Sequence, residues 1–203
     1  MTGKKTIKIG ITGGIGSGKS FVCAELARRG IAVYDCDSAA KRIMRSSDSV
    51  RAALTQLIGP AAYDGDGRLN KSAVAAFLLA SAENAAAIDA IVHPAVADDF
   101  RRSGNCWMEC AILFETGFNR LVDCVVAVTA PDDVRIRRVM ERDGITREKA
   151  LEWMARQWPQ EEVRRRADYE IVNDGVAGIG QQIDELIVKL KQKHNRKSCY
   201  RQS

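Results

Sequence analysis

The sequence predicts an α/β fold with a parallel sheet of about five strands. Apolar runs of strand length alternate along the chain with segments whose apolar residues recur at helical spacing, and this alternation is typical of parallel sheets with helical crossovers. The second observation is a glycine-rich loop, GITGGIGSGKS at residues 10–20, between the first strand-like run and the first helix. The third is a helical stretch at residues 37–103 that interrupts the alternation.

Each expected strand is a run of four to eight residues, most of them apolar. They are residues 6–12, 31–35, 106–113, 122–129 and 170–173. The expected helices are residues 19–29, 131–143, 147–157 and 178–192, with Gly30 and Gly144 as stops and Thr146 as a start. Two helices joined at Gly144 form a hairpin that could move as a lid.

The helical stretch at residues 37–103 is far longer than a crossover needs, since about a dozen residues suffice. We therefore expect a helical insertion that binds a second substrate. Within it, Pro94 is expected to kink a helix or to begin a new one. Asp64-Gly-Asp-Gly67 contains the DxxG of GTPase switches, but it follows no apolar strand, so we expect a surface turn there.

Charge and cysteine usage limit the possible partners and compartment. The net charge is +5, but six Lys and Arg residues lie from position 189 onward without any acidic residue. The basic character therefore belongs to a C-terminal tail, and we expect no nucleic-acid partner. The six cysteines form no CxxC pair, so we expect a reduced, cytoplasmic protein. No apolar run reaches 18 residues and no signal-peptide pattern opens the sequence, so we expect no membrane partner.

The glycine-rich loop matches GxxxxGK[ST] from Gly13 to Ser20 and lies between a strand and a helix. Glycines let backbone N–H groups converge on phosphate oxygens without a Cβ in the way. Lys19 can neutralise the β- and γ-phosphates, and the Ser20 hydroxyl can ligate Mg²⁺. The fold prediction therefore becomes a three-layer P-loop NTPase fold that binds a nucleoside triphosphate.

Two carboxylates, Asp35 and Asp37, follow the second expected strand. Ligands of open α/β sheets bind beyond the carboxyl ends of the strands, so these groups could hold hydrated Mg²⁺ or accept a hydroxyl proton. Asp37 could equally be the N-cap of the helix that follows. The spacing leaves both interpretations open.

Three arginines, Arg135, Arg138 and Arg142, recur on one face of the helix at residues 131–143. Facing the glycine loop, they would neutralise charge during phosphoryl transfer, and the alternative is a solvated surface. His93 alone is more often structural than catalytic. Glu115 stands where an acidic residue on the Mg²⁺ side could lie, although many strands end in a glutamate.

Transfer to water and transfer to a small molecule predict different sequences. A nucleotide switch would show DxxG after the third strand and a later NKxD, and neither is present. A small-molecule kinase would show an acceptor-binding insertion and an arginine-bearing lid that excludes water, and both are expected here. The residues alone predict a P-loop kinase and do not identify the acceptor.

In order along the chain, the motifs resemble those of the dephospho-CoA kinase family. The matching stretches are GITGGIGSGKS, GIAVYDCDSAAKRI, GRLNKSAVAAF, IVHPAV, AILFETG, VDCVVAVTAP, RRVMERDGIT, Gln157 and IVNDG. They span about residues 7–175. This sequence departs from the family in having Ala111-Ile112 where a proline often precedes LLFE, and Tyr34 at a position that is usually aliphatic.

The resemblance implies ATP- and Mg²⁺-dependent phosphorylation of the ribose 3′-hydroxyl of dephospho-CoA, the last step of coenzyme A biosynthesis. The alternative is another small-metabolite or nucleoside monophosphate kinase of the P-loop class. By the resemblance the catalytic residues are Asp37, Lys19, Arg142 and Arg138, with Asp37 as the base. The nucleotide-binding residues are Gly13, Gly14, Ile15, Gly16, Ser17, Gly18, Lys19, Ser20, Phe21, Asn173 and Gly175, with Ser20 also on the metal. The acceptor-binding residues are Asp35, Asp37, His93, Leu113, Phe114 and Glu115.

The expected domain organisation follows from these assignments. A nucleotide-binding core would comprise residues 1–36, 104–130 and 167–193, with an acceptor-binding insertion at 37–103 and a lid at 131–166. Residues 194–203 would be a flexible basic tail. We expect a monomer or a small homo-oligomer.

Overall fold

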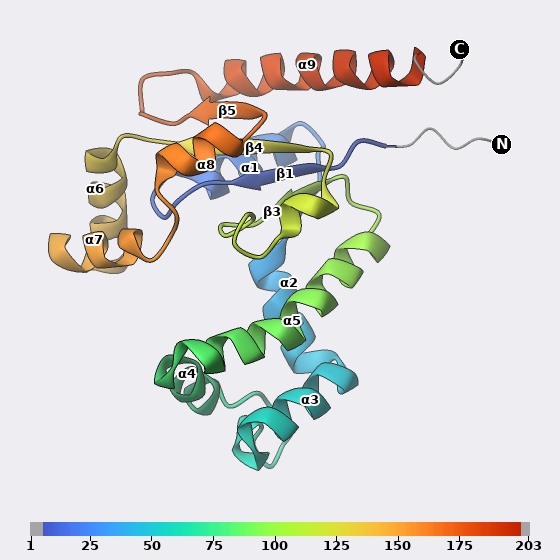
Figure 1. Ribbon diagram of the computed structural model, residues 1–203. Coiled ribbons are helices and arrows are strands. Elements are labelled where there is room, and N and C mark those ends of the chain that lie inside the picture. Colours follow the sequence, from blue (N-terminus) through green and yellow to red (C-terminus); the bar gives the residue numbers. More distant parts are fainter. Residues whose placement is uncertain (1–5, 200–203) are drawn as a thin grey trace. The chain divides into compact units, whose positions relative to one another are not determined.

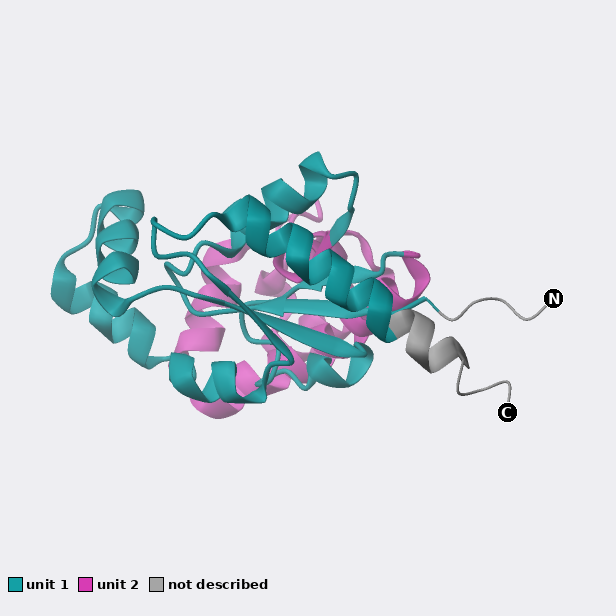
Figure 2. Cartoon of the chain, turned by 90° about the horizontal axis from the view of Figure 1, so that it is seen from above, with its two compact units in different colours: residues 1–33, 105–203 teal, residues 34–104 magenta. Residues whose placement is uncertain are grey.

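The structure is a computed structural model that describes the backbone of residues 6–199 and the side chains of residues 6–193. The chain forms two compact units, which Figure 2 shows in different colours. The first, which we call the core unit, combines the residues up to Val33 with those from Asn105 onward. The second, which we call the helical unit, is Tyr34–Gly104.

The predicted five-stranded parallel sheet is confirmed. Its strands are β1 (Ile9–Thr12), β2 (Val33–Asp35), β3 (Trp107–Glu109), β4 (Cys124–Thr129) and β5 (Tyr169–Val172), in the order β2-β3-β1-β4-β5. Ile9 of β1 lies opposite Trp107 of β3 and Cys124 of β4, with all three strands parallel. Because β1 is central, the glycine loop leaves the sheet from the middle of its carboxyl edge (Figure 1).

Helices of the core unit follow the strands. They are α1 (Lys19–Arg28), α6 (Asp132–Asp143), α7 (Arg147–Ala155), α8 (Gln160–Arg166) and α9 (Ile179–Cys199), with a 3₁₀ turn at Phe118–Leu121. The expected hairpin is present: Gly144 ends α6 with φ 64°, and the Thr146 hydroxyl caps α7 by accepting from the Lys149 N–H at 3.3 Å. Helix α8 was not predicted, because Val163 is its one buried residue and its sequence is otherwise strongly charged.

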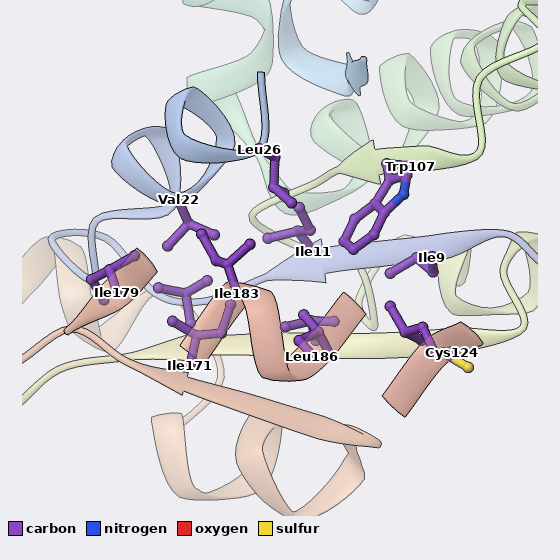
Figure 3. Close-up of a cluster of buried hydrophobic side chains, with 13 residues drawn as sticks. Ile9, Ile11, Val22, Leu26, Trp107, Cys124, Ile171, Ile179, Ile183 and Leu186 are labelled. Carbon is purple, nitrogen blue, oxygen red and sulfur yellow. The ribbon is translucent and has the colours of Figure 1, made fainter. Parts of the chain in front are cut away.

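The main core lies where α1 and α9 pack on the sheet (Figure 3). Alternate residues of β1, Ile9 and Ile11, point to the same face, as the period of a strand requires. Val22 and Leu26 of α1 meet them at helical spacing. Helix α9 contributes an apolar stripe, which comprises Ile179, Ile183, Leu186 and Leu190.

The helical unit contains α2 (Cys36–Ser46), α3 (Asp48–Ile58), a 3₁₀ turn (Pro60–Ala62), α4 (Lys71–Ala80) and α5 (Ala82–Arg102). Its buried side chains include Leu54 of α3 and Val96 and Phe100 of α5. Helix α5 is continuous through Pro94, so a new helix does not begin there. The stretch around Asp64 is a turn, as predicted: the Asp64 carboxylate accepts from the N–H groups of Asp66 and Arg68.

Among the boundaries that differ from the sequence predictions, the ends of β3 and α9 differ most. Strand β3 ends at Glu109 rather than residue 113, and the chain then turns, because Leu113 is buried beside Gly10 and Val122 while Ile112 is partly exposed. Helix α9 continues to Cys199, so residues 194–199 are helical, and the flexibility expected of the basic tail from residue 194 stays a prediction. No proline or glycine interrupts that stretch. Residues 200–203 lie outside the described part of the chain.

None of the helices within residues 6–199 has the length and apolar character that crossing a membrane requires.

The packing of α9 predicts a contrast between two of its residues. Ile183 is fully buried in the core, whereas Val188 is 52% exposed. We expect Ile183→Ala to lower the free energy of unfolding by about 2–5 kcal/mol, because it leaves a cavity against the sheet. The matched variant Val188→Ala should change it by less than about 0.5 kcal/mol. Urea denaturation measures both, and equal effects would contradict the packing of α9 described here.

Candidate functional site

The loop between β1 and α1 has a backbone that only glycine adopts easily. Gly13, Gly16 and Gly18 have φ values of 149°, 79° and 88°. A Cβ on Gly13 would collide with the Val128 carbonyl oxygen, and one on Gly18 would collide with the Asn173 amide nitrogen. The glycines are therefore required both by conformation and by the close approach of β4 and the residue after β5.

The loop carbonyls are held by side chains from outside it. The Gly13 oxygen accepts from Lys19 Nζ at 2.7 Å, and the Ile15 oxygen accepts from Arg135 Nε at 3.0 Å. The Ser17 oxygen accepts from Asn173 Nδ2 at 3.0 Å. Because the carbonyls are engaged in this way, the N–H groups are the polar groups left to face a ligand.

Four of those N–H groups, from Gly16, Gly18, Lys19 and Ser20, donate to no acceptor within residues 6–199. Those of Lys19 and Ser20 open α1, whose positive dipole end adds to the attraction for an anion. Converging backbone N–H groups of this kind form a cradle for phosphate oxygens.

Lys19 brings the positive charge to this cradle. Its side chain is 12% exposed, and burial lowers the pKa of its ammonium group from the ordinary value. The Glu109 carboxylate, 4.0 Å from Lys19 Nζ, opposes that shift by favouring the charged form. Sequence reasoning missed Glu109, which ends β3; the signal was a single glutamate inside the apolar run Cys106–Leu113.

A cavity of about 450 Å³ adjoins the loop within the core unit. Its walls come from the loop and α1, from α6, and from two residues of the connecting segments. The lining residues are Ile15, Gly16, Gly18, Lys19, Ser20, Ala111, Arg138, Val139, Arg142 and Gln157. The cavity therefore combines the N–H cradle with three cationic side chains, a combination suited to a polyphosphate.

The three arginines of α6 have different surroundings. Arg135 is 5% exposed and donates to the Ile15 oxygen and to Asp132, so it supports the loop from outside the cavity. Arg138 lines the cavity and donates to both the backbone oxygen and the side-chain oxygen of Asn173, at 3.0 and 3.2 Å. Arg142 also lines the cavity, and it pairs with Asp143 at 2.7 Å.

Asn173 joins the loop to α6. It is 7% exposed, its N–H donates to the Thr129 oxygen at 2.7 Å, and its side chain bridges Ser17 and Arg138. The turn that follows is closed by the Asp174 carboxylate, which accepts from two backbone N–H groups. These bonds hold the pKa of Asp174 below its ordinary value. Gly175 has φ 90°, which the turn requires.

The residues Leu113 to Glu115 meet the end of the α6–α7 hairpin. The Phe114 ring stacks on Trp158 with ring centres 6.0 Å apart, and Glu115 Oε1 accepts from the Trp158 N–H at 3.4 Å. Leu113 is fully buried, which favours a packing role for it. Contact of these three residues with the acceptor stays a prediction.

In the helical unit, Asp35 rather than Asp37 is the N-cap of α2. Asp35 Oδ1 accepts from the N–H groups of Asp37 and Ser38 at 2.9 and 3.0 Å, and Oδ2 accepts from the Ser38 hydroxyl at 2.7 Å. Asp37 lies in the first turn with its side chain 72% exposed and pairs with Lys41 one turn later. The two carboxylates are therefore distinct: one is used by the helix, and the other faces solvent.

Tyr34 and His93 each have a carboxylate partner on α5. The Tyr34 hydroxyl donates to Asp99 at 2.7 Å, and Arg42 of α2 donates to the same carboxylate oxygen at 2.6 Å. The Arg42 guanidinium holds the pKa of Asp99 below its ordinary value, and burial raises the pKa of the Tyr34 phenol. His93 Nε2 lies 3.3 Å from Asp89, one turn earlier on the helix.

The family model for dephospho-CoA kinases matches residues 7–178. The dephospho-CoA kinase of Bacteroides fragilis strain YCH46 is 40% identical over 194 residues, which cover 92% of this chain and 94% of that protein.

Two solved structures bear on the fold. A crystal structure of a Thermus thermophilus protein is 35% identical with a TM-score of 0.77, covering 90% of this chain and 96% of that one. The dephospho-CoA kinase from Campylobacter jejuni has a TM-score of 0.65 at 17% identity, with 92% and 98% covered, and supports the fold alone. With its cradle, lysine and cationic cavity, the chain thus belongs to the dephospho-CoA kinase family, the ATP-using P-loop kinases of coenzyme A biosynthesis.

Proposed function

We propose that the chain phosphorylates the ribose 3′-hydroxyl of dephospho-CoA with ATP held in the loop cavity of the core unit. The observation that carries this proposal is the set of four unengaged N–H groups around Lys19, beside Arg138 and Arg142. We propose further that the helical unit binds the acceptor and that α6 and α7 act as the lid.

On the donor side, the proposed roles follow charge. The N–H groups and Lys19 would bind the β- and γ-phosphates, and Arg138 and Arg142 would stabilise the charge that spreads over the transferring group. The remaining loop residues, with Phe21, Asn173 and Gly175, would fix the nucleotide. The pairing of Arg142 with Asp143 implies that Arg142 exchanges this partner for phosphate oxygens when ATP binds.

Mg²⁺ fits the residues present. Among residues 6–193, whose side chains the structure describes, no group of three or more His, Cys, Asp or Glu could hold a metal ion by itself. That agrees with Mg²⁺, which keeps several waters and is bound by few protein ligands together with substrate phosphates. The Ser20 hydroxyl would be a ligand, and Glu109 would hold its waters. When bound, the ion neutralises phosphate charge.

On the acceptor side, the capping arrangement favours Asp37 as the base. Asp35 already accepts three hydrogen bonds from the start of α2, so its lone pairs serve the helix. Asp37 has no such duty, and its carboxylate could exchange Lys41 for the acceptor hydroxyl. Asp35 would then be the residue that positions Asp37, and His93, Phe114 and Glu115 would contact the acceptor.

We propose a cytoplasmic protein, since the six cysteines of the sequence form no CxxC pair. We also propose a monomer or a small homo-oligomer.

A panel of acceptors tests the proposed reaction. ADP release from ATP should be stimulated by dephospho-CoA and not by AMP, shikimate or gluconate. The matched control is 3′-deoxy-dephospho-CoA, which keeps every other contact and lacks the reacting oxygen, and it should inhibit rather than stimulate. Stimulation by AMP, or equal stimulation by the deoxy compound, would contradict transfer to the 3′-hydroxyl.

Substitutions of Asp35 and Asp37 should have different effects on kinetics and stability. Asp37→Asn should lower kcat by about 10²-fold or more with little change in the affinity for ATP, because it removes only the proton acceptor. Asp35→Asn should have the smaller effect on kcat, because an amide oxygen still accepts from the first N–H groups of α2. It should lower the melting temperature, because the amide NH₂ group cannot accept from the Ser38 hydroxyl. Steady-state kinetics and thermal unfolding measure both. The reverse ranking in kcat would assign the base to Asp35.

A further inference from the structure

We propose that Gln157 is a phosphate-contacting residue: its side-chain NH₂ group donates to the γ-phosphoryl group of bound ATP while its carbonyl oxygen holds the glycine loop. This deepens the proposed function, on which it rests, by adding a neutral donor beside Lys19, Arg138 and Arg142. Gln157 lies just after α7, at the end of the α6–α7 hairpin.

The orientation of the Gln157 amide is set by its partner. The Ile15 N–H donates to Gln157 Oε1 at 2.7 Å. A backbone N–H can only donate, so the oxygen and not the nitrogen of the amide must face it. The NH₂ group is then the remaining polar end of a side chain that lines the cavity. In the part of the chain that the structure describes, no hydrogen bond from this NH₂ group is found.

Contacts of Gln157 itself and of the next residue in the sequence hold this segment in place. Its own N–H donates to the Met154 oxygen at 3.2 Å, which ties it to the last turn of α7. The next residue, Trp158, stacks on Phe114, donates to Glu115, and lies under the Arg166 guanidinium at 4.8 Å. Because these contacts already restrict the segment, little further conformational entropy is lost when the Gln157 amide contacts a ligand.

Three parts of Ile15 contact the α6–α7 hairpin or the residue that follows it. Its N–H meets Gln157, its carbonyl meets Arg135, and its side chain packs against the cluster of Ile136, Val139 and Ala150. Ile15 therefore moves with the hairpin, and Gln157 keeps a fixed place relative to the loop. A donor fixed in advance where charge develops is worth most in the transition state, and removing one costs about 10²–10³ in kcat.

Two variants separate phosphate contact from loop support. Gln157→Glu keeps an oxygen for the Ile15 N–H but replaces the NH₂ donor by a negatively charged oxygen. Gln157→Leu removes both groups. The matched control is Gln160→Leu, because Gln160 also uses both ends of its amide, on the N–H and the oxygen of Ala130, and does not line the cavity.

Calorimetry with ADP and with the β,γ-imido analogue of ATP gives a readout that is independent of the acceptor. We expect Gln157→Glu and Gln157→Leu to weaken the triphosphate at least tenfold relative to ADP, and Gln160→Leu to leave that ratio within about threefold. In the dephospho-CoA assay, Gln157→Glu should lower kcat by about 10² or more.

Two outcomes would overturn the proposal. If Gln157→Glu behaves as the parent protein, Gln157 serves only the Ile15 N–H. If it weakens ADP and the triphosphate equally, Gln157 acts through the loop rather than on the γ-phosphoryl group. An absent response of the parent to dephospho-CoA would instead refute the proposed acceptor, while the triphosphate-to-ADP ratio would still decide the role of Gln157.

Discussion

The hydrogen bonds that hold the backbone carbonyls of the glycine loop are the constraint on which the rest of the site depends. Every carbonyl from Gly13 to Gly18 accepts a hydrogen bond: from side chains at Gly13, Ile15, Gly16 and Ser17, and from backbone N–H groups at Gly14 and Gly18. With the oxygens engaged, the N–H groups of Gly16, Gly18, Lys19 and Ser20 are left for a ligand. An anion cradle therefore follows from where the carbonyls are satisfied, as much as from the glycines themselves.

This arrangement links phosphate binding to the hairpin and to the turn after β5. Asn173 and Arg138 each contact the loop and also each other. Gln157 accepts from the N–H of Ile15, and Arg135 donates to the carbonyl oxygen of the same residue. A change in the hairpin therefore reaches the loop directly through hydrogen bonds, without any need for a long pathway. If α6 and α7 act as the proposed lid, water exclusion and phosphate positioning would be properties of one connected structure, as a kinase that must prefer a hydroxyl to water requires.

The sequence predicted the parallel sheet, the glycine loop and the hairpin, because each has a strong local signal: apolar runs, GxxxxGK[ST], and Gly144 before Thr146. The sequence alone could not assign different roles to residues of the same type that lie close together in one segment. Arg135, Arg138 and Arg142 look alike in a helical pattern, and only the tertiary contacts show that Arg135 supports a carbonyl. In the same way, two aspartates flank Cys36, and only the hydrogen bonds show that Asp35 caps α2. Glu109 was missed because an apolar strand was expected to continue beyond it.

The affinity of Asn173→Ala for inorganic tripolyphosphate tests this account most directly. The variant leaves the Ser17 oxygen without its donor, and Gln182→Ala is the matched control, since Gln182 clamps both backbone groups of Val172 and does not contact the loop. The account predicts that Asn173→Ala weakens tripolyphosphate about tenfold, and ATP to the same extent, with Gln182→Ala close to the parent. Unchanged binding of tripolyphosphate by Asn173→Ala, with or without a loss of affinity for ATP, would contradict this account. It would mean that the phosphate-binding conformation of the loop does not depend on the side chains that hold its carbonyls.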